Sequence, residues 1–367
     1  MRETTIGLEA TRANKQYKTG TEWYAWHLLQ EFKNLDKDNR FIVYYNEYLA
    51  GELKDAPGNF IFKKLTWPFK KFWTHIRLSF ELIKNPVDKF FASNAVPLFS
   101  RGEIIVTIHD LGFYCNPKLY HPLELIYQRL SHRLAIKKAD KIIAVSETTK
   151  KDIIKYFPGT ENKIRVIYHG WNGDDFGGMS KEDIQDYKDY HDMPDKFILY
   201  IGRLETKKNI QNLVKAYKKT TRRWPLVLGG RPGNHGYKEI EKLIQDPEIK
   251  DDIILLGYVS QKNYPKLMAS ASMFVFPSKF EGFGIPLLEA MASKVPIACS
   301  DIPVLHEVAG EAAMYFDPDD TVDMSGVLDK LMKDAELREK YINKGHDRAN
   351  EFSWRKSAQE TLNFILE

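Results

Sequence analysis

Two glutamates, Glu281 and Glu289, lie eight positions apart in the stretch KFEGFGIPLLEAMASKVPIACSD. Gly282 and Gly284 stand between them, and the apolar run that follows has Pro286 near its start, as helices often do. Glycines let backbone N–H groups turn toward a ligand, and a helix N-terminus carries partial positive charge, so this turn predicts an anion site. Each carboxylate can accept hydrogen bonds from two neighbouring hydroxyls, such as those of a sugar or a ribose. The pattern therefore predicts two diol-binding carboxylates that flank a bound anion.

A structural interpretation of the same pair is available. Glu289 could be an acid that stabilises the first turn of a helix, and Glu281 could be a solvated loop residue. For an arbitrary pair of glutamates at this spacing, that interpretation is favoured. Here the strand pattern FVFPS before the turn, the glycines, the proline and the apolar run together favour a functional pair.

Two cations occupy a comparable place in FILYIGRLETKKNI, where Arg203 and Lys208 follow a strand pattern and open a helix. A pair of cations there could neutralise a diphosphate leaving group. Taken alone, a strand-ending arginine and surface lysines are more often structural. His109 and Asp110 end another strand pattern, EIIVTIHD, and a histidine in that position is also more often a hydrogen-bonded structural residue than a catalyst.

The elements that must position these residues alternate along the chain. Strand patterns occur near residues 7, 41, 90, 103, 141 and 163, and again near 197, 225, 253, 273 and 296, with helical patterns between them. This alternation predicts an α/β chain of two doubly wound, Rossmann-like domains over 1–172 and 195–350, joined by a linker over 173–194. Ligands of such sheets bind outside the carboxyl ends of the strands, so a central cleft between the domains is the expected site.

Composition excludes several classes of protein. The 367 residues are 43% hydrophobic and 28% charged, as in ordinary globular proteins, and a net charge of +4 does not argue for nucleic-acid binding. The N-terminal stretch lacks the apolar core of a signal peptide, and no apolar run is long enough to span a membrane, so we expect a cytoplasmic protein. Cys115 and Cys299 belong to no pattern typical of a disulfide framework or a zinc site.

A basic and aromatic stretch, KKLTWPFKKFWTHIRLSFELIK, runs from Lys63 to Lys84. One interpretation is an amphipathic surface helix that settles on an anionic membrane, where a lipid-linked acceptor would wait. The alternative is an ordinary solvated helix whose aromatic side chains are buried.

The stretch EGFGIPLLEAMA resembles the E-x7-E motif of the retaining glycosyltransferases of family 4, which have the GT-B fold. VTIHDLGFYCNPKLY, ADKIIAVSETTKKDI, IRVIYHG, YIGRLETKKNI, ILLGYVS and the near-terminal FSW are similar to segments of that family in the same order, and they cover nearly the whole chain. The resemblance is strongest to the mannosyltransferase-like members that build bacterial surface polysaccharides. It implies that an amphipathic helix over about 351–367 packs back on the N-terminal domain.

The resemblance also implies roles for individual residues. Glu281 would hold the transferred sugar, Glu289 the ribose, and Arg203 with Lys208 the diphosphate. Lys207 is adjacent, so the choice of Lys208 over Lys207 rests on alignment with the family. Tyr258 would lie beside the nucleotide base, although it could equally be a core aromatic. The implied catalytic residues are His109, Glu281, Arg203 and Lys208, and the implied donor-binding residues are Gly20, Thr21, Arg203, Lys208, Tyr258, Glu281, Gly282, Phe283, Gly284, Ile285 and Glu289.

The expected activity is retaining transfer of a hexose, with mannose as the first candidate, from a GDP- or UDP-linked sugar to a glycan or lipid-linked acceptor. No metal or cofactor is expected, because neither an Asp-x-Asp motif in a plausible place nor a Walker P-loop occurs. The inner face of the cytoplasmic membrane is the candidate location. Two rival classes remain: another GT-B enzyme, such as a nucleotide-sugar epimerase or a pyridoxal-phosphate phosphorylase, and a catalytically silent sugar- or membrane-binding module.

Overall fold

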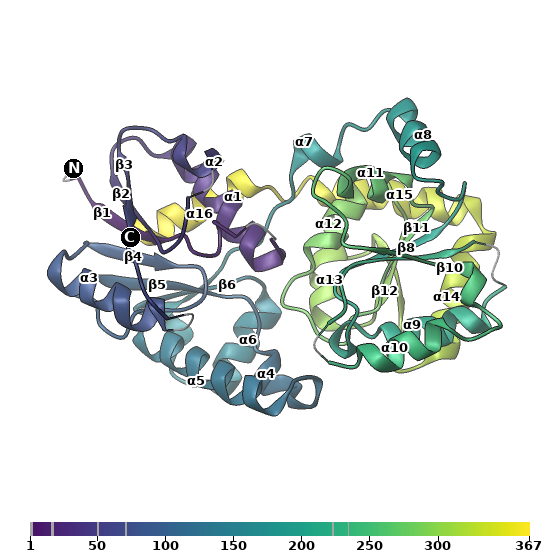
Figure 1. Cartoon of the computed structure of the whole chain (residues 1–367), viewed down its shortest axis with the longest axis horizontal. Helices are drawn as coiled ribbons and strands as arrows, with labels where there is room; N and C mark the ends of the chain where they lie inside the picture. Colours follow the sequence, from purple (N-terminus) through teal and green to yellow (C-terminus); the bar gives the residue numbers. More distant parts are fainter. Residues whose placement is uncertain (1–2, 16–17, 50, 70–71, 222–223, 234) are drawn as a thin grey trace. The chain divides into compact units, whose positions relative to one another are not determined.

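The structure, a computed structural model, describes the chain except for residues 1–2, 16–17, 50, 70–71, 222–223 and 234. It divides into two compact units (Figure 1). The first unit contains residues 1–115, 122–170 and 354–367, and the second contains residues 116–121 and 171–353. Each unit is built around its own parallel sheet.

The sheet of the first unit has seven parallel strands in the order β3-β2-β1-β4-β5-β6-β7. The strand order reverses between β1 and β4, which makes this pair the topological switch point of the sheet. Most of the central strand residues are buried, as expected for a parallel sheet covered on both faces. The strands are β1 (Thr5–Glu9), β2 (Arg40–Tyr45), β3 (Phe60–Lys64), β4 (Lys89–Ala92), β5 (Glu103–Ile108), β6 (Lys141–Ala144) and β7 (Ile164–Val166).

Helices cover both faces of this first sheet (Figure 1). The last helix of the chain, α16, packs against α1, so the C-terminal helix returns to the N-terminal unit as the GT-B resemblance implied. The helices of the first unit are α1 (Gly20–Leu35), α2 (Gly51–Lys54), α3 (Leu78–Lys84), α4 (Gly112–Cys115), α5 (Pro122–Lys138), α6 (Glu147–Tyr156) and α16 (Trp354–Leu366).

The sheet of the second unit has six parallel strands in the order β10-β9-β8-β11-β12-β13. Its strand order reverses between β8 and β11, so this pair is the switch point of the second sheet. The strands are β8 (Ile198–Ile201), β9 (Leu226–Gly229), β10 (Ile253–Gly257), β11 (Met273–Phe276), β12 (Ile297–Ser300) and β13 (Ala313–Phe316).

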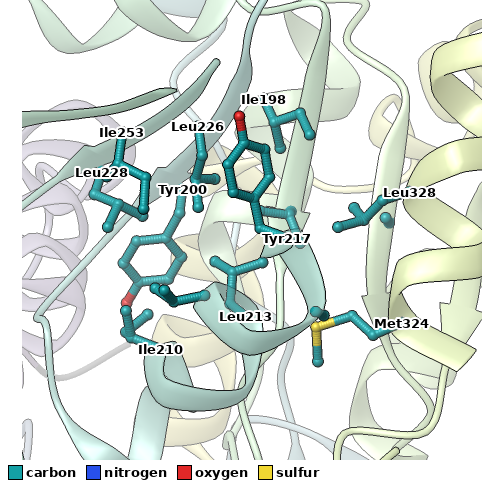
Figure 2. Packing of buried hydrophobic residues seen from close by; sticks show 14 of the residues in the cluster. Ile198, Tyr200, Ile210, Leu213, Tyr217, Leu226, Leu228, Ile253, Met324 and Leu328 are labelled. Atoms are coloured by element: carbon teal, nitrogen blue, oxygen red, sulfur yellow. The ribbon is translucent and has the colours of Figure 1, made fainter. Parts of the chain in front are cut away.

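The core of the second unit forms where its strands meet the apolar faces of the helices (Figure 2). Tyr200 and Tyr217 lie in this cluster, and the Tyr217 hydroxyl donates to the Trp224 carbonyl at 3.1 Å, which satisfies its polar end. The helices are α7 (Gly173–Phe176), α8 (Lys181–Tyr190), α9 (Ile210–Lys219), α10 (Tyr237–Ile244), α11 (Tyr264–Ser270), α12 (Ile285–Ala292), α13 (Pro303–Ala309), α14 (Thr321–Lys333) and α15 (Ala335–Ala349).

The predicted fold class, two doubly wound Rossmann-like domains, is confirmed, but several details differ. Residues 173–194, expected as a linker, contain α7 and α8, and α8 packs on α11 within the second unit. Strands β3 and β13 had no counterpart in the sequence analysis. Both are edge strands, and β3 lies at the start of the basic stretch that we interpreted as a helix.

That basic stretch is not a single helix. It contains the end of β3, a π-helical turn (Trp73–Arg77) and the short helix α3, with Lys70 and Lys71 outside the described residues. Trp73 is buried and its indole N–H donates to the Leu65 carbonyl at 2.7 Å. The prediction of one amphipathic helix here is therefore wrong, because Lys63 and Lys64 belong to β3 and Trp73 packs into the core.

Candidate active site

Three of the predicted donor-binding residues of the second unit lie at the switch point between β8 and β11. Arg203 comes two residues after β8, and Lys208 ends the short 3-10 turn that follows it. Glu281 comes five residues after β11, in the glycine-rich turn that leads into α12. Because both strands are parallel neighbours, their carboxyl ends meet at one edge of the sheet. The topology thus brings together residues more than seventy positions apart in sequence.

Lys208 and Glu281 form an ion pair across this switch point. The lysine Nζ lies 2.5 Å from the glutamate Oε1, and the two side chains are 21% and 11% exposed. Glu281 is therefore not the solvated loop residue of the structural interpretation. Lys207 instead lies over the rings of Tyr120 and Phe280, at 5.5 and 5.6 Å from their centroids, so Lys208 is the lysine aimed at the glutamate motif.

The glycine turn opens α12 in the way that its sequence predicted. Gly284 has a φ of 107° and precedes the first residue of the helix, Ile285. An added Cβ at Gly284 would lie 3.2 Å from the Leu305 side chain, so both the backbone angle and the space favour glycine. The Phe283 side chain is buried and packs edge-on against Phe352, with the ring centroids 6.0 Å apart.

Glu289 is the fifth residue of α12, beyond the first turn, so its proposed role as a first-turn acid is wrong. The Tyr264 hydroxyl, from the start of α11, donates to its Oε2. Burial raises the pKa of Glu289 to about 7; the hydrogen bond from Tyr264 lowers it, and the nearby charge of Asp175 adds to the rise. This carboxyl consequently changes charge near neutral pH.

Arg203 and Tyr258 present exposed side chains. Arg203 is 46% exposed, and its Nε lies 3.4 Å from Glu205 Oε2. Its carbonyl accepts a hydrogen bond at 2.9 Å from the buried Tyr200 hydroxyl, which fixes the backbone where β8 ends. Tyr258 is 45% exposed, and the Arg231 guanidinium lies over its ring at 4.7 Å, so the interpretation of Tyr258 as a core aromatic is wrong.

The first unit places His109 directly after β5. Its Nε2 lies 2.9 Å from the carbonyl oxygen of Ser93, which follows β4. A carbonyl only accepts hydrogen bonds, so Nε2 carries the proton and Nδ1 is left as an acceptor. Burial, reinforced by the positive charge of Arg12, lowers the pKa of His109 to about 4. The ring is therefore neutral at physiological pH and can accept a hydrogen bond from a hydroxyl.

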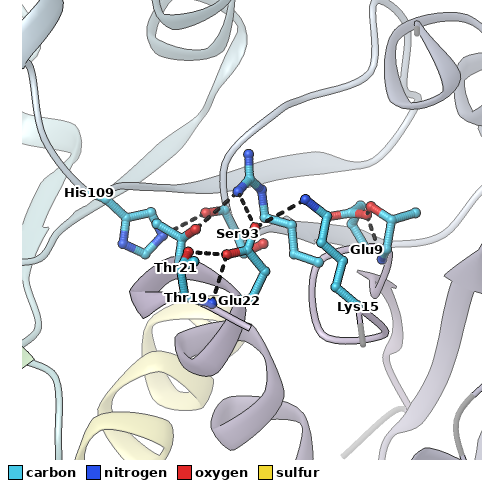
Figure 3. A network of polar contacts seen from close by, with 9 residues as sticks. Glu9, Lys15, Thr19, Thr21, Glu22, Ser93 and His109 are labelled. Carbon is cyan, nitrogen blue, oxygen red and sulfur yellow. Dashed lines mark hydrogen bonds and ion pairs between the residues drawn. The ribbon is translucent and has the colours of Figure 1, made fainter. Parts of the chain in front are cut away.

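A polar network surrounds the carboxyl end of β1 and the start of α1 (Figure 3). The Glu22 carboxylate lies 3.2 Å from both Arg12 Nη1 and Lys15 Nζ, and Arg12 Nη1 also donates to the Thr21 hydroxyl at 3.0 Å. Burial opposes ionisation of Glu22, but the hydrogen bond from Thr19 and the two cations outweigh it, so its pKa is lowered.

Gly20 is the first residue of α1, and no atom would lie within 4 Å of an added Cβ. Its backbone does not have the positive φ that would demand glycine. The position thus has no structural requirement for glycine.

Sequence reasoning missed several polar residues of these switch points. Arg12 closely follows β1 and Glu22 lies in the first turn of α1, and those places could have marked them as candidates. Tyr264 could not have been found in this way, because its contact with Glu289 depends on how α11 packs near α12.

The described residues contain neither a cluster of metal ligands nor a membrane-spanning helix. Within the ranges that the structure describes, no group of three or more His, Cys, Asp or Glu side chains is placed to hold a metal ion. Among the helices in those same ranges, none is both long and apolar enough to cross a membrane.

Comparisons with known proteins match both units. The family model described as Glycosyltransferase Family 4 matches residues 19–174, and the model described as Glycosyl transferases group 1 matches residues 182–348. O-antigen chain mannosyltransferase B of Escherichia coli is 32% identical over 266 residues, which are 71% of this chain and 69% of that protein. O-antigen chain mannosyltransferase RfbU of Salmonella typhimurium is 30% identical over 70% of this chain and 68% of its own length.

Solved structures agree on the fold. A sucrose-phosphate synthase from Thermosynechococcus elongatus superimposes with a TM-score of 0.79 at 17% identity, covering 98% of both chains. Anabaena HepE, solved in complex with UDP and glucose, superimposes with a TM-score of 0.76 at 17% identity, covering 99% of this chain and 100% of that one. From its sequence relatives and its paired Rossmann-like sheets, the chain belongs to the group 1 and family 4 glycosyltransferases and has their GT-B fold.

Proposed function

We propose that this glycosyltransferase moves a hexose, with mannose as the first candidate, from a nucleotide-diphosphate sugar to a glycan or lipid-linked acceptor in surface-polysaccharide synthesis. The observation that carries the proposal is the Lys208–Glu281 ion pair at the β8/β11 switch point, beside the glycine turn that opens α12. The printed activities of the bacterial relatives, O-antigen chain mannosyltransferases, support mannose. The solved HepE complex supports a nucleoside diphosphate as the leaving group.

In this proposal the second unit holds the donor. Glu281 accepts hydrogen bonds from the transferred sugar, and Glu289 accepts them from the ribose hydroxyls. Lys208, the exposed guanidinium of Arg203 and the main-chain N–H groups around Gly284 stabilise negative charge on the departing diphosphate. Those cations and the helix N-terminus would take the place of a metal ion.

The first unit would bind the acceptor. Neutral His109, with Nδ1 as its acceptor atom, can receive a hydrogen bond from a sugar hydroxyl. Arg12 and Lys15 share the single Glu22 carboxylate near the end of β1, with Thr21 beside them, so a net positive charge remains there to attract oxygen-rich groups.

The proposed chemistry is a front-face displacement that retains the anomeric configuration. The acceptor oxygen bonds to the anomeric carbon on the face from which the diphosphate leaves. The bond between that carbon and the phosphate oxygen breaks, its electron pair stays on the phosphate, and the acceptor proton moves to that same oxygen. A covalent glycosyl-enzyme trapped with a slow donor analogue would overturn this route and establish a double displacement.

The test is a donor screen with GDP-mannose, UDP-glucose, UDP-N-acetylglucosamine and related nucleotide sugars. The expected result is a rise in thermal midpoint with one donor, followed by release of its nucleoside diphosphate. Release of an epimerised sugar nucleotide, or turnover that requires inorganic phosphate, would establish one of the rival enzyme classes. Binding without any turnover, even with a polysaccharide-derived acceptor, would establish a silent binding module.

We further propose a cytoplasmic enzyme in peripheral contact with an anionic membrane, where a lipid-linked acceptor is presented. The stretch from Lys63 to Lys84, our first candidate for that contact, offers less than its sequence suggested. Lys63 lies 2.5 Å from Glu81, and Arg77 also lies within ion-pair distance of the same carboxylate, so two of its cations share one negative charge.

A further inference from the structure

Helix α5 exposes an apolar stripe that nothing in the proposed chemistry uses. Leu123, Ile126, Tyr127 and Leu130 follow one another at the spacing of a single helix face, and they are 74, 58, 42 and 64% exposed. The helix is nonetheless anchored to its unit through its other face, where His132, Ala135 and Ile136 are buried. Arg129 Nε also donates to the Phe113 carbonyl at 2.7 Å, which ties the half of α5 that carries the stripe to α4.

The same stripe ends in positive charge. Arg133 and Lys137 continue it toward the carboxyl end of α5, and both are exposed. They also line an open cavity of about 510 Å³ together with Tyr156 and other residues near the end of α6. Lys138, beside them, lies 5.5 Å from the ring of Phe99, which is itself exposed. Apolar side chains beside cations and a basic hollow match the chemistry of a lipid surface with anionic headgroups.

We propose that the α5 surface, formed by Leu123, Ile126, Tyr127, Leu130, Arg133 and Lys137, docks the enzyme on an anionic membrane. The apolar residues would enter the boundary between headgroups and acyl chains, while the two cations and the cavity beside them meet the phosphates. The inference deepens the proposed function, because a membrane-bound acceptor would give the docking its purpose. Vesicle binding is measured without donor or acceptor. Loss of vesicle binding with intact donor turnover would therefore count against the docking surface alone, and loss of turnover with intact vesicle binding would count against the proposed function alone.

A second copy of the chain is a poorer occupant of this surface. In a symmetric dimer through α5, Arg133 and Lys137 would face a surface with the same cations, and like charges at close range repel. The α5 helix itself carries four Lys or Arg residues and only one acid, Glu124. Its field therefore favours a negative partner.

The test is co-sedimentation of the whole protein with vesicles that contain phosphatidylglycerol, compared with vesicles of phosphatidylcholine alone. Binding is expected only to the anionic vesicles and should weaken at high salt. The triple variant Leu123→Gln, Ile126→Gln, Leu130→Gln is expected to bind about tenfold more weakly. The double variant Arg133→Gln, Lys137→Gln should lose most of the salt-sensitive part of the binding.

Two control variants separate the α5 surface from exposed apolar residues in general. Val322→Gln with Tyr190→Gln removes comparable exposed side chains from the second unit and should leave vesicle binding as in the parent. Phe69→Gln with Phe80→Gln tests the competing basic stretch and should also leave it nearly unchanged. An unaltered thermal midpoint and rate of donor hydrolysis would show that the triple variant is folded; if it is not, the double variant carries the test alone.

Three results would overturn the proposal: no binding of the parent to phosphatidylglycerol vesicles, parent-like binding of both α5 variants, or loss of binding in the Phe69/Phe80 variant alone. Sedimentation equilibrium measures the oligomeric state and so tests the other possible occupant of this surface, a second copy of the chain. A parent dimer that the triple variant converts to a monomer would assign the α5 surface to a second copy and would also overturn the membrane proposal.

Discussion

At the scale of single residues, the two glutamates of the glycine turn differ in charge as well as in position. Glu281 is held by Lys208, which keeps a cation 2.5 Å from its carboxylate. Glu289 faces the hydroxyl of Tyr264 and the charge of Asp175, and its pKa is raised to about 7. We therefore expect Glu289 to give donor binding a dependence on pH near neutrality.

This difference predicts how donor affinity changes with pH. The ionised Glu289 carboxylate is a stronger acceptor for the ribose hydroxyls than the protonated carboxyl, so affinity for the nucleotide sugar should rise about tenfold from pH 6 to pH 8. The diphosphate of a nucleotide sugar does not titrate in this range. Calorimetric titration should show the rise in the parent and no rise in Glu289→Gln. A His109→Gln variant should keep the rise, because the pKa of His109 is about 4.

The raised pKa of Glu289 also predicts a change in stability. The folded protein holds this proton more tightly than the unfolded chain, so the contribution of Glu289 to the free energy of unfolding falls as pH rises from about 4.5 to about 7. The variant Glu289→Gln lacks that loss and should gain about 1–3 kcal/mol over the parent above pH 7. Denaturant unfolding at pH 5 and pH 8 measures the effect, and an equal difference at both pH values would contradict it.

The ion pair of Lys208 and Glu281 predicts non-additive effects. Each single variant, Lys208→Met or Glu281→Gln, removes one member of a coupled pair and should lower kcat about 100-fold or more. Because residues that act as a unit lose their function together, the double variant should be little slower than the single variants. Rates of nucleoside diphosphate release at saturating donor measure this, and a double variant whose loss is the product of the two would refute coupling.

At the scale of elements, glycines set the turns on which the candidate donor residues lie. Gly230, directly after β9, has a φ of 145°, and an added Cβ would lie 1.7 Å from the Gly202 carbonyl oxygen. Gly202 in turn directly precedes Arg203. A side chain at Gly230 must therefore displace the backbone that presents the arginine.

We predict that Gly230→Ala lowers the free energy of unfolding by about 2–4 kcal/mol and weakens donor binding. Gly326, in the middle of α14, has no atom within 4 Å of an added Cβ, so Gly326→Ala serves as the control. It should stabilise the protein by up to about 1 kcal/mol, because alanine favours a helix. Equal stabilities of the two variants in denaturant unfolding would contradict the steric account.

The burial of each strand explains which strands could be predicted from the sequence. The central strands were predictable because burial on both faces makes them apolar runs, as in β5 and β11. The edge strands β3 and β13 were not, because β3 lies in a lysine- and aromatic-rich stretch, and only the first and last residues of β13 are buried. Site residues that directly follow a strand, such as Arg203 and His109, could be predicted from that position. The contact of Tyr264 with Glu289 could not, because it depends on helix packing.

At the scale of the whole molecule, the chain crosses between its units more than once. After the second unit ends at residue 353, α16 returns to the first unit and packs against α1. Trp354, the first residue of α16, is buried, and its ring stacks on that of His27 at 4.8 Å. The last helix is thus part of the core of the N-terminal unit.

We predict that Trp354→Ala lowers the free energy of unfolding of the first unit by about 3–5 kcal/mol. Leu366→Ala, at the exposed end of the same helix, is the control and should cost far less. Donor binding by the second unit should survive both changes. Thermal unfolding with and without donor separates these effects, and loss of donor binding in Trp354→Ala at a temperature where the protein is folded would contradict the assignment of the donor to the second unit.

One rate decides whether the protein transfers a sugar from a nucleotide-diphosphate donor held by Glu281 and Lys208. We would measure release of nucleoside diphosphate from the donor found by the screen, for the parent, Glu281→Gln and the control Glu311→Gln, whose carboxylate pairs with Lys344. We expect turnover in the parent, unchanged turnover in the control and a loss of about 100-fold or more in Glu281→Gln. Parent-like turnover by Glu281→Gln would contradict this expectation.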